Sequence, residues 1–210
     1  PAVVPAGRLT GGGLGGHARA FGATSGLPGY VVAGGDEPPA DPCHARPVEH
    51  VVAVDVGGTK LAAAVVGEDG SIVHRDRAPT AGHDADALLA TLTDLVDRVV
   101  ARSGVVPAGC GVGCGGPMAP GGATVSPLNI AVWREFPLRD RLAGHLGVPA
   151  WVDNDAKALA LGEGWLGAAA GSRNFLAMVV STGVGGGIVL DGRLLDGESG
   201  NAGHIGHVIV

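Results

Sequence analysis

The feature that most constrains this chain is a polar turn between two apolar runs, VVAVDVGGTKLAAAVV. Short apolar runs bounded by glycine predict buried strands, here Val51–Val56 and Leu61–Val66. A simple hairpin turn requires glycine, but it does not require Asp55, Thr59 and Lys60 as well. The pattern therefore predicts a sheet edge that presents a carboxylate, a hydroxyl and an amine together.

The rest of the chain alternates between strand and helix patterns. A third strand completes a meander, and helices and further strands then follow in turn. A meander followed by helix–strand alternation predicts an α/β architecture with a mixed sheet. The further elements predicted are strands at Ser71–Ala78, Cys110–Cys114, Ala150–Val152, Asn174–Ser181 and Ile188–Leu190, and helices at Asp84–Ser103, Pro137–Leu146 and Asp155–Ala170.

Composition excludes some classes of function. The net charge of −6 argues against nucleic acid as an electrostatic partner. The apolar runs are far shorter than the roughly 20 residues of a membrane span, and no signal-peptide pattern opens the sequence. Three cysteines are too few for a disulfide framework and fit a reducing, cytoplasmic compartment. We therefore expect no nucleic-acid partner and no membrane partner.

The ends of the sequence differ from its centre. Residues 1–47 are rich in Gly, Pro and Ala without an apolar period, which predicts a flexible tail. The last residues, GHVIV, resemble the start of a strand, so we expect the chain to be a fragment of a longer protein.

The turn D-V-G-G-T-K has the properties of a phosphate site. Consecutive glycine amides can form an anion-binding nest, and Thr59 adds a hydroxyl donor. Asp55 would repel phosphate unless a cation such as Mg²⁺ lies between them. The turn is not a Walker A loop, because Leu61 follows Lys60 and the motif spacing is absent. An ordinary hairpin turn remains the alternative.

A second turn of similar composition occurs in VVSTGVGGGIVLDG, residues 179–192. Two such turns could face each other across a cleft and hold the two ends of one polyphosphate, with Thr182 and Gly183 at the second end. A chance pair of glycine-rich hairpins is the alternative in a chain with 39 glycines.

The run Gly111–Gly116 matches G-x-G-x-x-G but does not predict a dinucleotide site. Such a site requires a helix that begins at the third glycine. Pro117, Pro120 and two further glycines follow instead, so we reject this interpretation.

The segment WVDNDAKALALGEG places polar residues where a predicted strand meets a helix. Ligands of α/β proteins bind at such strand ends. Asp155 could accept a proton from a substrate hydroxyl, and Asn154 could hold a neighbouring hydroxyl. Alternatively, either Asp153 or Asp155 caps the helix. Further on, His204 and His207 have H-x-x-H spacing, which fits metal ligation, sugar contacts or a polar loop.

Taken in order, these motifs resemble the ROK family of bacterial sugar kinases and sugar-responsive repressors, over roughly residues 50–210. The motifs that carry the resemblance are VDVGGTK, SPLNIAVW with Asn129, VDNDAKALALGE, STGVGGGI and GNAGHIGH. The last departs from the family's A-G-E-x-G-H, because His204 replaces a glutamate that contacts the sugar.

The resemblance implies an actin-like ATPase (ribonuclease H-like) fold with two lobes around a cleft. We place the first lobe at 48–157 and the start of an incomplete second lobe at 158–210. It also implies a homo-oligomer in the full-length protein. A zinc site with His207 as one ligand is a further implication, although the cysteines that would complete it do not follow in this sequence.

The function that we expect is ATP-dependent phosphorylation of a hexose, glucose-like at O6, with Asp155 as the base and Mg²⁺ at Asp55. The alternatives are a sugar-responsive regulator of the same family and a non-catalytic sugar-binding protein. The residues expected to position phosphates are Gly57, Gly58, Thr59, Lys60, Thr182 and Gly183, and those expected to line the sugar pocket are Gly116, Asn129, Asn154, His204 and His207.

Overall fold

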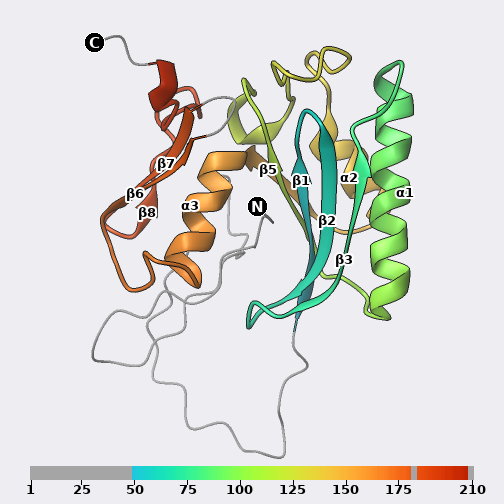
Figure 1. Ribbon diagram of the computed structural model, residues 1–210, viewed down its shortest axis with the longest axis horizontal. Helices are drawn as coiled ribbons and strands as arrows, with labels where there is room; N and C mark the ends of the chain where they lie inside the picture. Colours follow the sequence, from blue (N-terminus) through green and yellow to red (C-terminus); the bar gives the residue numbers. More distant parts are fainter. Residues whose placement is uncertain (1–48, 181–183, 208–210) are drawn as a thin grey trace, which may run out of the picture.

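The computed structural model describes residues 49–180 and 184–207, so the predicted tail at 1–47 lies outside it. The described chain forms a five-stranded sheet in the order β3-β2-β1-β4-β5 and a three-stranded sheet in the order β6-β7-β8. In Figure 1, α3 lies between the two sheets, whereas α1 and α2 cover the far side of the larger sheet. The strands are β1 His50–Val56, β2 Lys60–Gly67, β3 Ile72–Pro79, β4 Cys110–Cys114, β5 Ala150–Asn154, β6 Phe175–Val180, β7 Val184–Leu190 and β8 Arg193–Leu194; the helices are α1 Ala85–Ser103, α2 Leu138–Leu146 and α3 Asp155–Trp165.

The larger sheet is mixed, as the sequence predicted. Strands β1, β2 and β3 form an antiparallel meander, and β4 and β5 then add to β1 in parallel. Because β1, β4 and β5 run in the same direction, their carboxyl ends reach one edge of the sheet. The polar turn after β1 and the polar segment after β5 therefore lie at that edge.

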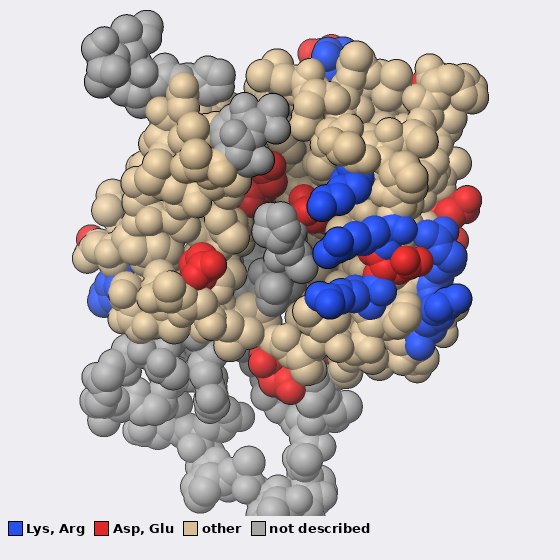
Figure 2. All heavy atoms as spheres, viewed as in Figure 1, with Lys and Arg blue, Asp and Glu red and all other residues tan. Residues whose placement is uncertain are grey.

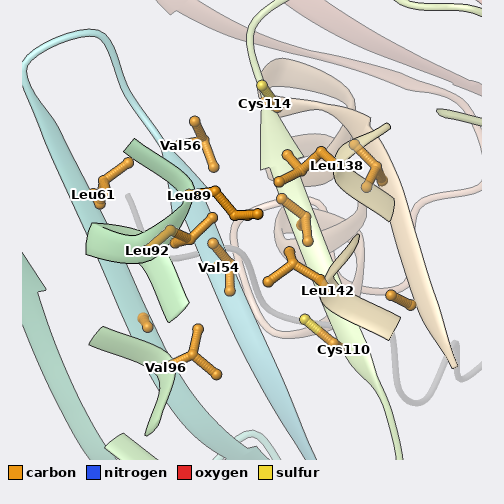
Figure 3. Close-up of a cluster of buried hydrophobic side chains, with 14 of the residues drawn as sticks. Val54, Val56, Leu61, Leu89, Leu92, Val96, Cys110, Cys114, Leu138 and Leu142 are labelled. Atoms are coloured by element: carbon orange, nitrogen blue, oxygen red, sulfur yellow. The ribbon is translucent and has the colours of Figure 1, made fainter. Parts of the chain in front are cut away.

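The main hydrophobic core lies between this sheet and the helices α1 and α2 (Figure 3). Alternate residues of β1, which are Val52, Val54 and Val56, point into it, together with Leu92 and Val96 of α1. The opposite face of the sheet carries the smaller cluster of Ala53, Ala64, Val66 and Trp165, the last from α3. The sheet is therefore covered on both faces, which explains why β1 is almost continuously apolar.

Helix α1 begins and ends as its sequence predicts. The Asp84 carboxylate accepts a 2.8 Å hydrogen bond from the backbone N–H of Ala87, and Gly104 ends the helix with a φ of 68°. A side-chain acceptor at the N-cap and a left-handed glycine at the C-terminus are common helix boundaries. Within the described ranges, no helix is both long enough and apolar enough to cross a bilayer.

Helix α3 is shorter than the prediction of Asp155–Ala170. It ends at Trp165, and the following residues turn back onto Glu163. The Glu163 side chain accepts from the N–H of Ala168 at 2.8 Å, and its carbonyl accepts from Gly167 and Ala169. Glu163 thus caps the C-terminal turn by contacts that a run of alanines does not reveal.

Strand β7 begins earlier than predicted, at Val184 rather than at Ile188. The glycines that suggested a turn extending to residue 187 instead lie in the strand, where α3 packs against them. A methyl group placed on Gly187 would lie 2.5 Å from Cβ of Ala160 and 2.8 Å from the carbonyl oxygen of Ala156. Glycine is therefore required there for close contact between strand and helix.

We predict that Gly187→Ala destabilises the protein, because either α3 or β7 must move to admit the methyl group. Overpacking of this kind costs about 1–3 kcal/mol, which corresponds to a fall in Tm of roughly 2–12 °C for a chain of this size. The matched control is Gly111→Ala in β4, where no described atom lies within 4 Å of the added methyl. Thermal unfolding that is equally affected by both changes would contradict this packing.

Candidate functional site

The candidate site lies at the edge where the parallel strands end. Asp55 of β1 is in register with Gly113 of β4, which is in register with Asp153 of β5. Neighbouring strands are about 4.8 Å apart, so the two aspartates lie roughly 10 Å apart on one face of the sheet. Gly113 carries no side chain between them. Figure 2 shows acidic atoms recessed in this middle region, with basic side chains gathered over β2 and β3 beside it.

The glycine turn after β1 is held tightly from two sides. The N–H of Gly57 donates to the carbonyl of Lys60 at 3.1 Å, and the carbonyl of Gly57 accepts from the Thr80 hydroxyl at 2.6 Å. The N–H of Thr80 in turn donates to the carbonyl of Thr59. Thr59 and Lys60 are exposed at the tip of the turn, where a bound anion could reach them.

Asp55 is a half-buried carboxylate in a partly basic setting. Burial raises the pKa of Asp55 above its ordinary value, and the negative charge of Asp155 raises it further. Lys60 and Arg77 act in the opposite direction and lower this pKa. Two carboxylates that repel each other at one edge provide oxygen ligands of the type that Mg²⁺ prefers.

The polar residues at the junction of β5 and α3, which are Asp153, Asn154 and Asp155, have different roles. The helix cap is Asn154, whose side-chain oxygen accepts from the N–H of Ala156 at 3.0 Å, whereas the sequence had suggested an aspartate for this position. Asn154 is buried, and its amide nitrogen remains on the side of Gly116. Asp155 occupies the first helical position and is exposed.

Two glycines bring the predicted sugar residues together. A methyl group on Gly116 would lie 3.3 Å from Cε1 of His204 and 3.8 Å from the side-chain nitrogen of Asn154. A methyl group on Gly58 would lie 2.5 Å from the side-chain nitrogen of Asn129. The structure thus gathers Gly116, Asn154 and His204 at one point, and it packs Asn129 directly against the glycine turn.

Some residues of the predicted site are not among those that the structure describes. Thr182 and Gly183 are not among the described residues, nor is the side chain of His207. In the described part of the chain, no three His, Cys, Asp or Glu side chains form a group suited to a metal ion. The zinc prediction therefore has no support from the residues that the structure describes.

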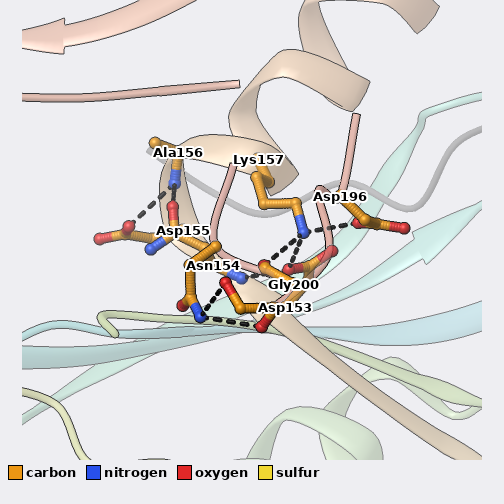
Figure 4. Close-up of polar contacts among 9 residues, drawn as sticks. Asp153, Asn154, Asp155, Ala156, Lys157, Asp196 and Gly200 are labelled. Carbon is orange, nitrogen blue, oxygen red and sulfur yellow. Dashed lines mark hydrogen bonds and ion pairs between the residues drawn. The ribbon is translucent and has the colours of Figure 1, made fainter. Parts of the chain in front are cut away.

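Sequence reasoning gave no role to Lys157, which the structure places at the centre of a polar cluster (Figure 4). Its side chain is 2% exposed, and its Nζ lies 2.8 Å from a carboxylate oxygen of Asp153 and 2.7 Å from one of Asp196. The Gly200 carbonyl accepts a third contact at 3.1 Å. The sequence signals were a lysine in the first turn of a helix, where acidic residues are favoured, and the spacing of four residues between Asp153 and Lys157.

Comparison with known proteins identifies the family of this chain. The family model described as "ROK family" matches residues 51–210. The chain belongs to the ROK family. ROK proteins similar to it include the glucokinase of Halalkalibacterium halodurans, which is 41% identical over 171 residues, or 76% of this chain and 49% of the relative. The N-acetylmannosamine kinase of Citrobacter koseri is 41% identical over 167 residues, which cover 75% of this chain and 53% of that relative.

A solved ROK structure is similar over the same region. The ROK family glucokinase from Streptomyces griseus, in complex with glucose and AMPPNP, is 35% identical with a TM-score of 0.67, and the match covers 77% of this chain and 51% of that one. The chain therefore spans about half the length of the relatives it matches. The predicted fold is confirmed: ROK sugar kinases have the actin-like ATPase fold, and this chain shares it over the matched part.

We predict that Asp55→Asn stabilises the protein when no nucleotide or metal is present. A raised pKa means that ionised Asp55 opposes folding; this cost is complete at pH values above the folded-state pKa and disappears as the pH falls through the unfolded-state pKa. The gain in Tm should therefore be present at pH 7–8 and vanish as the pH falls below about 4, where the carboxyl is neutral in both states.

The control is Asp94→Asn, which removes the same charge from an exposed position of α1. Thermal melts across pH give the comparison. A Tm that falls at pH 7–8 in Asp55→Asn alone would contradict the electrostatic account.

Proposed function

We propose that the protein carrying this sequence is an ATP-dependent sugar kinase that transfers the γ-phosphoryl group of ATP to a hexose, glucose-like, at O6. The observation that carries the proposal is the shared edge of β1 and β5. It places the glycine turn and Asp55 opposite the exposed Asp155, close enough for the charge of Asp155 to shift the pKa of Asp55. The similarity to named glucokinases supports the choice of reaction.

The proposed roles follow from this arrangement. The backbone of Gly57 and Gly58, with Thr59 and Lys60, binds phosphate oxygens at the turn, and Thr182 and Gly183 bind the other end of the nucleotide. Asp55 holds Mg²⁺, which neutralises the charge that gathers on the phosphates during transfer. Phosphoryl transfer depends mainly on positioning and charge neutralisation, and a sparse set of rigidly held groups suits it.

Asp155 accepts the proton of the hexose hydroxyl as that oxygen attacks the γ-phosphorus. Its place at the first position of α3 leaves it exposed toward the site, whereas Asp153 is engaged by Lys157. The sugar lies among Gly116, Asn129, Asn154, His204 and His207, where Asn154 donates through its amide because its oxygen caps the helix. We also propose that the first lobe ends near residue 157, so that the sugar lies between two lobes.

Asp155→Asn tests the base in the protein that carries this sequence. Asparagine keeps the shape but cannot take the proton, and general bases typically contribute about 10²–10⁴-fold in rate. We expect kcat with glucose and ATP to fall by that factor, while glucose affinity measured by calorimetry changes little.

The matched control is Asp191→Asn, at the far end of β7. Its φ of 52° suits asparagine, so only charge is removed. An Asp155→Asn enzyme with near-normal kcat would contradict the assigned role.

His204→Glu tests the sugar pocket. A carboxylate accepts hydrogen bonds from hydroxyls in many orientations, whereas neutral imidazole offers one donor and one acceptor. We expect the kcat/KM ranking of glucose, mannose and N-acetylmannosamine to change while the KM for ATP stays nearly constant. The same ranking in both proteins would remove His204 from the sugar site.

A further inference from the structure

The Lys157 cluster, defined as Asp153, Lys157, Asp196 and the Gly200 carbonyl, joins parts of the chain that are far apart in sequence. Asp153 is the next-to-last residue of β5 in the larger sheet, and Lys157 lies on α3. Asp196 and Gly200 belong to the irregular segment between β8 and His204, 39 and 43 residues beyond Lys157. One ammonium group therefore connects the end of β5 to the segment that leads to His204.

That segment, residues 195–203, contains no regular secondary structure. Asp196 holds the two ends of this segment together, because its backbone carbonyl accepts a hydrogen bond from the N–H of Ala202 at 3.0 Å. The carboxylate of Asp196 contacts Lys157. At its far end, the carbonyl of Gly203 accepts from the N–H of Gly186 in β7 at 2.9 Å. Within the described chain, His204 thus follows a loop that is fixed to α3 on one side and to β7 on the other.

Stability alone does not explain a lysine at this position. Burial of a charged pair typically costs as much as the attraction returns, and a cation in the first turn of a helix opposes the helix dipole. The carboxylates do keep Lys157 charged: burial lowers its pKa, but contacts with Asp153 and Asp196 outweigh this and hold the pKa above its ordinary value. A charged, buried group with three partners has one well-defined geometry, which suits a positioning role.

We propose that Lys157 is a positioning residue that sets the distance between His204 and the Asn154–Asp155 pair by binding Asp153 on one side and Asp196 and Gly200 on the other. The inference rests on the proposed function and extends it. It assigns hexose affinity in part to a contact that does not touch the sugar. Loss of the contact releases the 195–203 loop, so that His204 is no longer held beside Gly116 and Asn154.

The test uses Asp196→Ala in the protein that carries this sequence, because Lys157 then keeps its ion pair with Asp153. Asp196 itself is 58% exposed, so its removal leaves no buried cavity. We expect the glucose KM and calorimetric Kd to rise about 10-fold or more, with kcat reduced less than 3-fold and the KM for ATP unchanged. Asp196→Asn, which keeps an acceptor oxygen, should recover part of the affinity.

The control is Glu198→Ala, which removes a negative charge from an exposed position of the same loop. It should leave glucose affinity at the wild-type value. If Asp196→Ala lowers the Tm but leaves the glucose Kd unchanged, the contact is purely structural and the proposal is overturned. Equal changes of glucose affinity in Asp196→Ala and Glu198→Ala would also overturn it.

Hydrogen exchange separates this inference from the proposed function. Amides of residues 197–204 should exchange faster in Asp196→Ala than in the wild type, whether or not the protein phosphorylates a hexose. Faster exchange with no glucose binding by the wild type would reject the proposed function and, with it, the role in sugar affinity. Unchanged exchange together with intact glucose binding would reject the positioning role alone.

Discussion

The site depends on the parallel pairing of β1, β4 and β5. This pairing aligns Asp55, Gly113 and Asp153 in one row and brings the turn after β1 and the start of α3 to the same edge. The antiparallel partner β2 then returns from the turn, so the glycine turn is held between two sheet strands. Burial of Asp55 at this edge raises its pKa, and the negative charge of Asp155 raises it further.

Close contacts at glycines shape this edge and the packing of α3 beside it. Asn129 packs on Gly58, His204 and Asn154 approach Gly116, and α3 packs on Gly187. A single methyl group at any of these glycines would obstruct or tighten the contact. Glycine is therefore needed at these positions because it lets neighbouring groups approach closely, rather than because it makes the backbone flexible. In this account the proposed phosphate site and the proposed sugar site are adjacent, because Asn129 of the sugar site contacts the glycine turn that precedes β2.

The sequence predicted strands β1 to β7 but not β8, and it predicted the α1 boundaries and the polar edge, because these follow from local patterns of apolar residues, caps and glycines. It extended α3 by five residues, since the capping contacts of Glu163 depend on how the chain turns back after Trp165. It also extended a turn to residue 187, because the glycines of β7 are explained only by α3 lying against them. The role of Lys157 was not predicted, because two of its three partners, Asp196 and Gly200, are 39 and 43 residues away.

The Asn154 cap shows how local and distant roles combine. The oxygen of its side chain belongs to the helix, and the nitrogen remains for the site, so one residue both starts α3 and faces Gly116. Asp153 also has two roles, because its Oδ1 accepts a hydrogen bond from the N–H of Asn154 and contacts Nζ of Lys157. This leaves Asp155 as the exposed carboxylate of the segment, which is the basis for its proposed role.

The most direct test of the central claim is a crystal structure of the protein that carries this sequence with glucose, Mg²⁺ and AMPPNP bound. The account predicts the glucose O6 hydroxyl within about 2.6–3.2 Å of the Asp155 carboxylate and Mg²⁺ beside Asp55, with phosphates on the Gly57–Lys60 turn. A sugar hydroxyl that contacts Asp153 instead, or phosphates bound away from that turn, would contradict it.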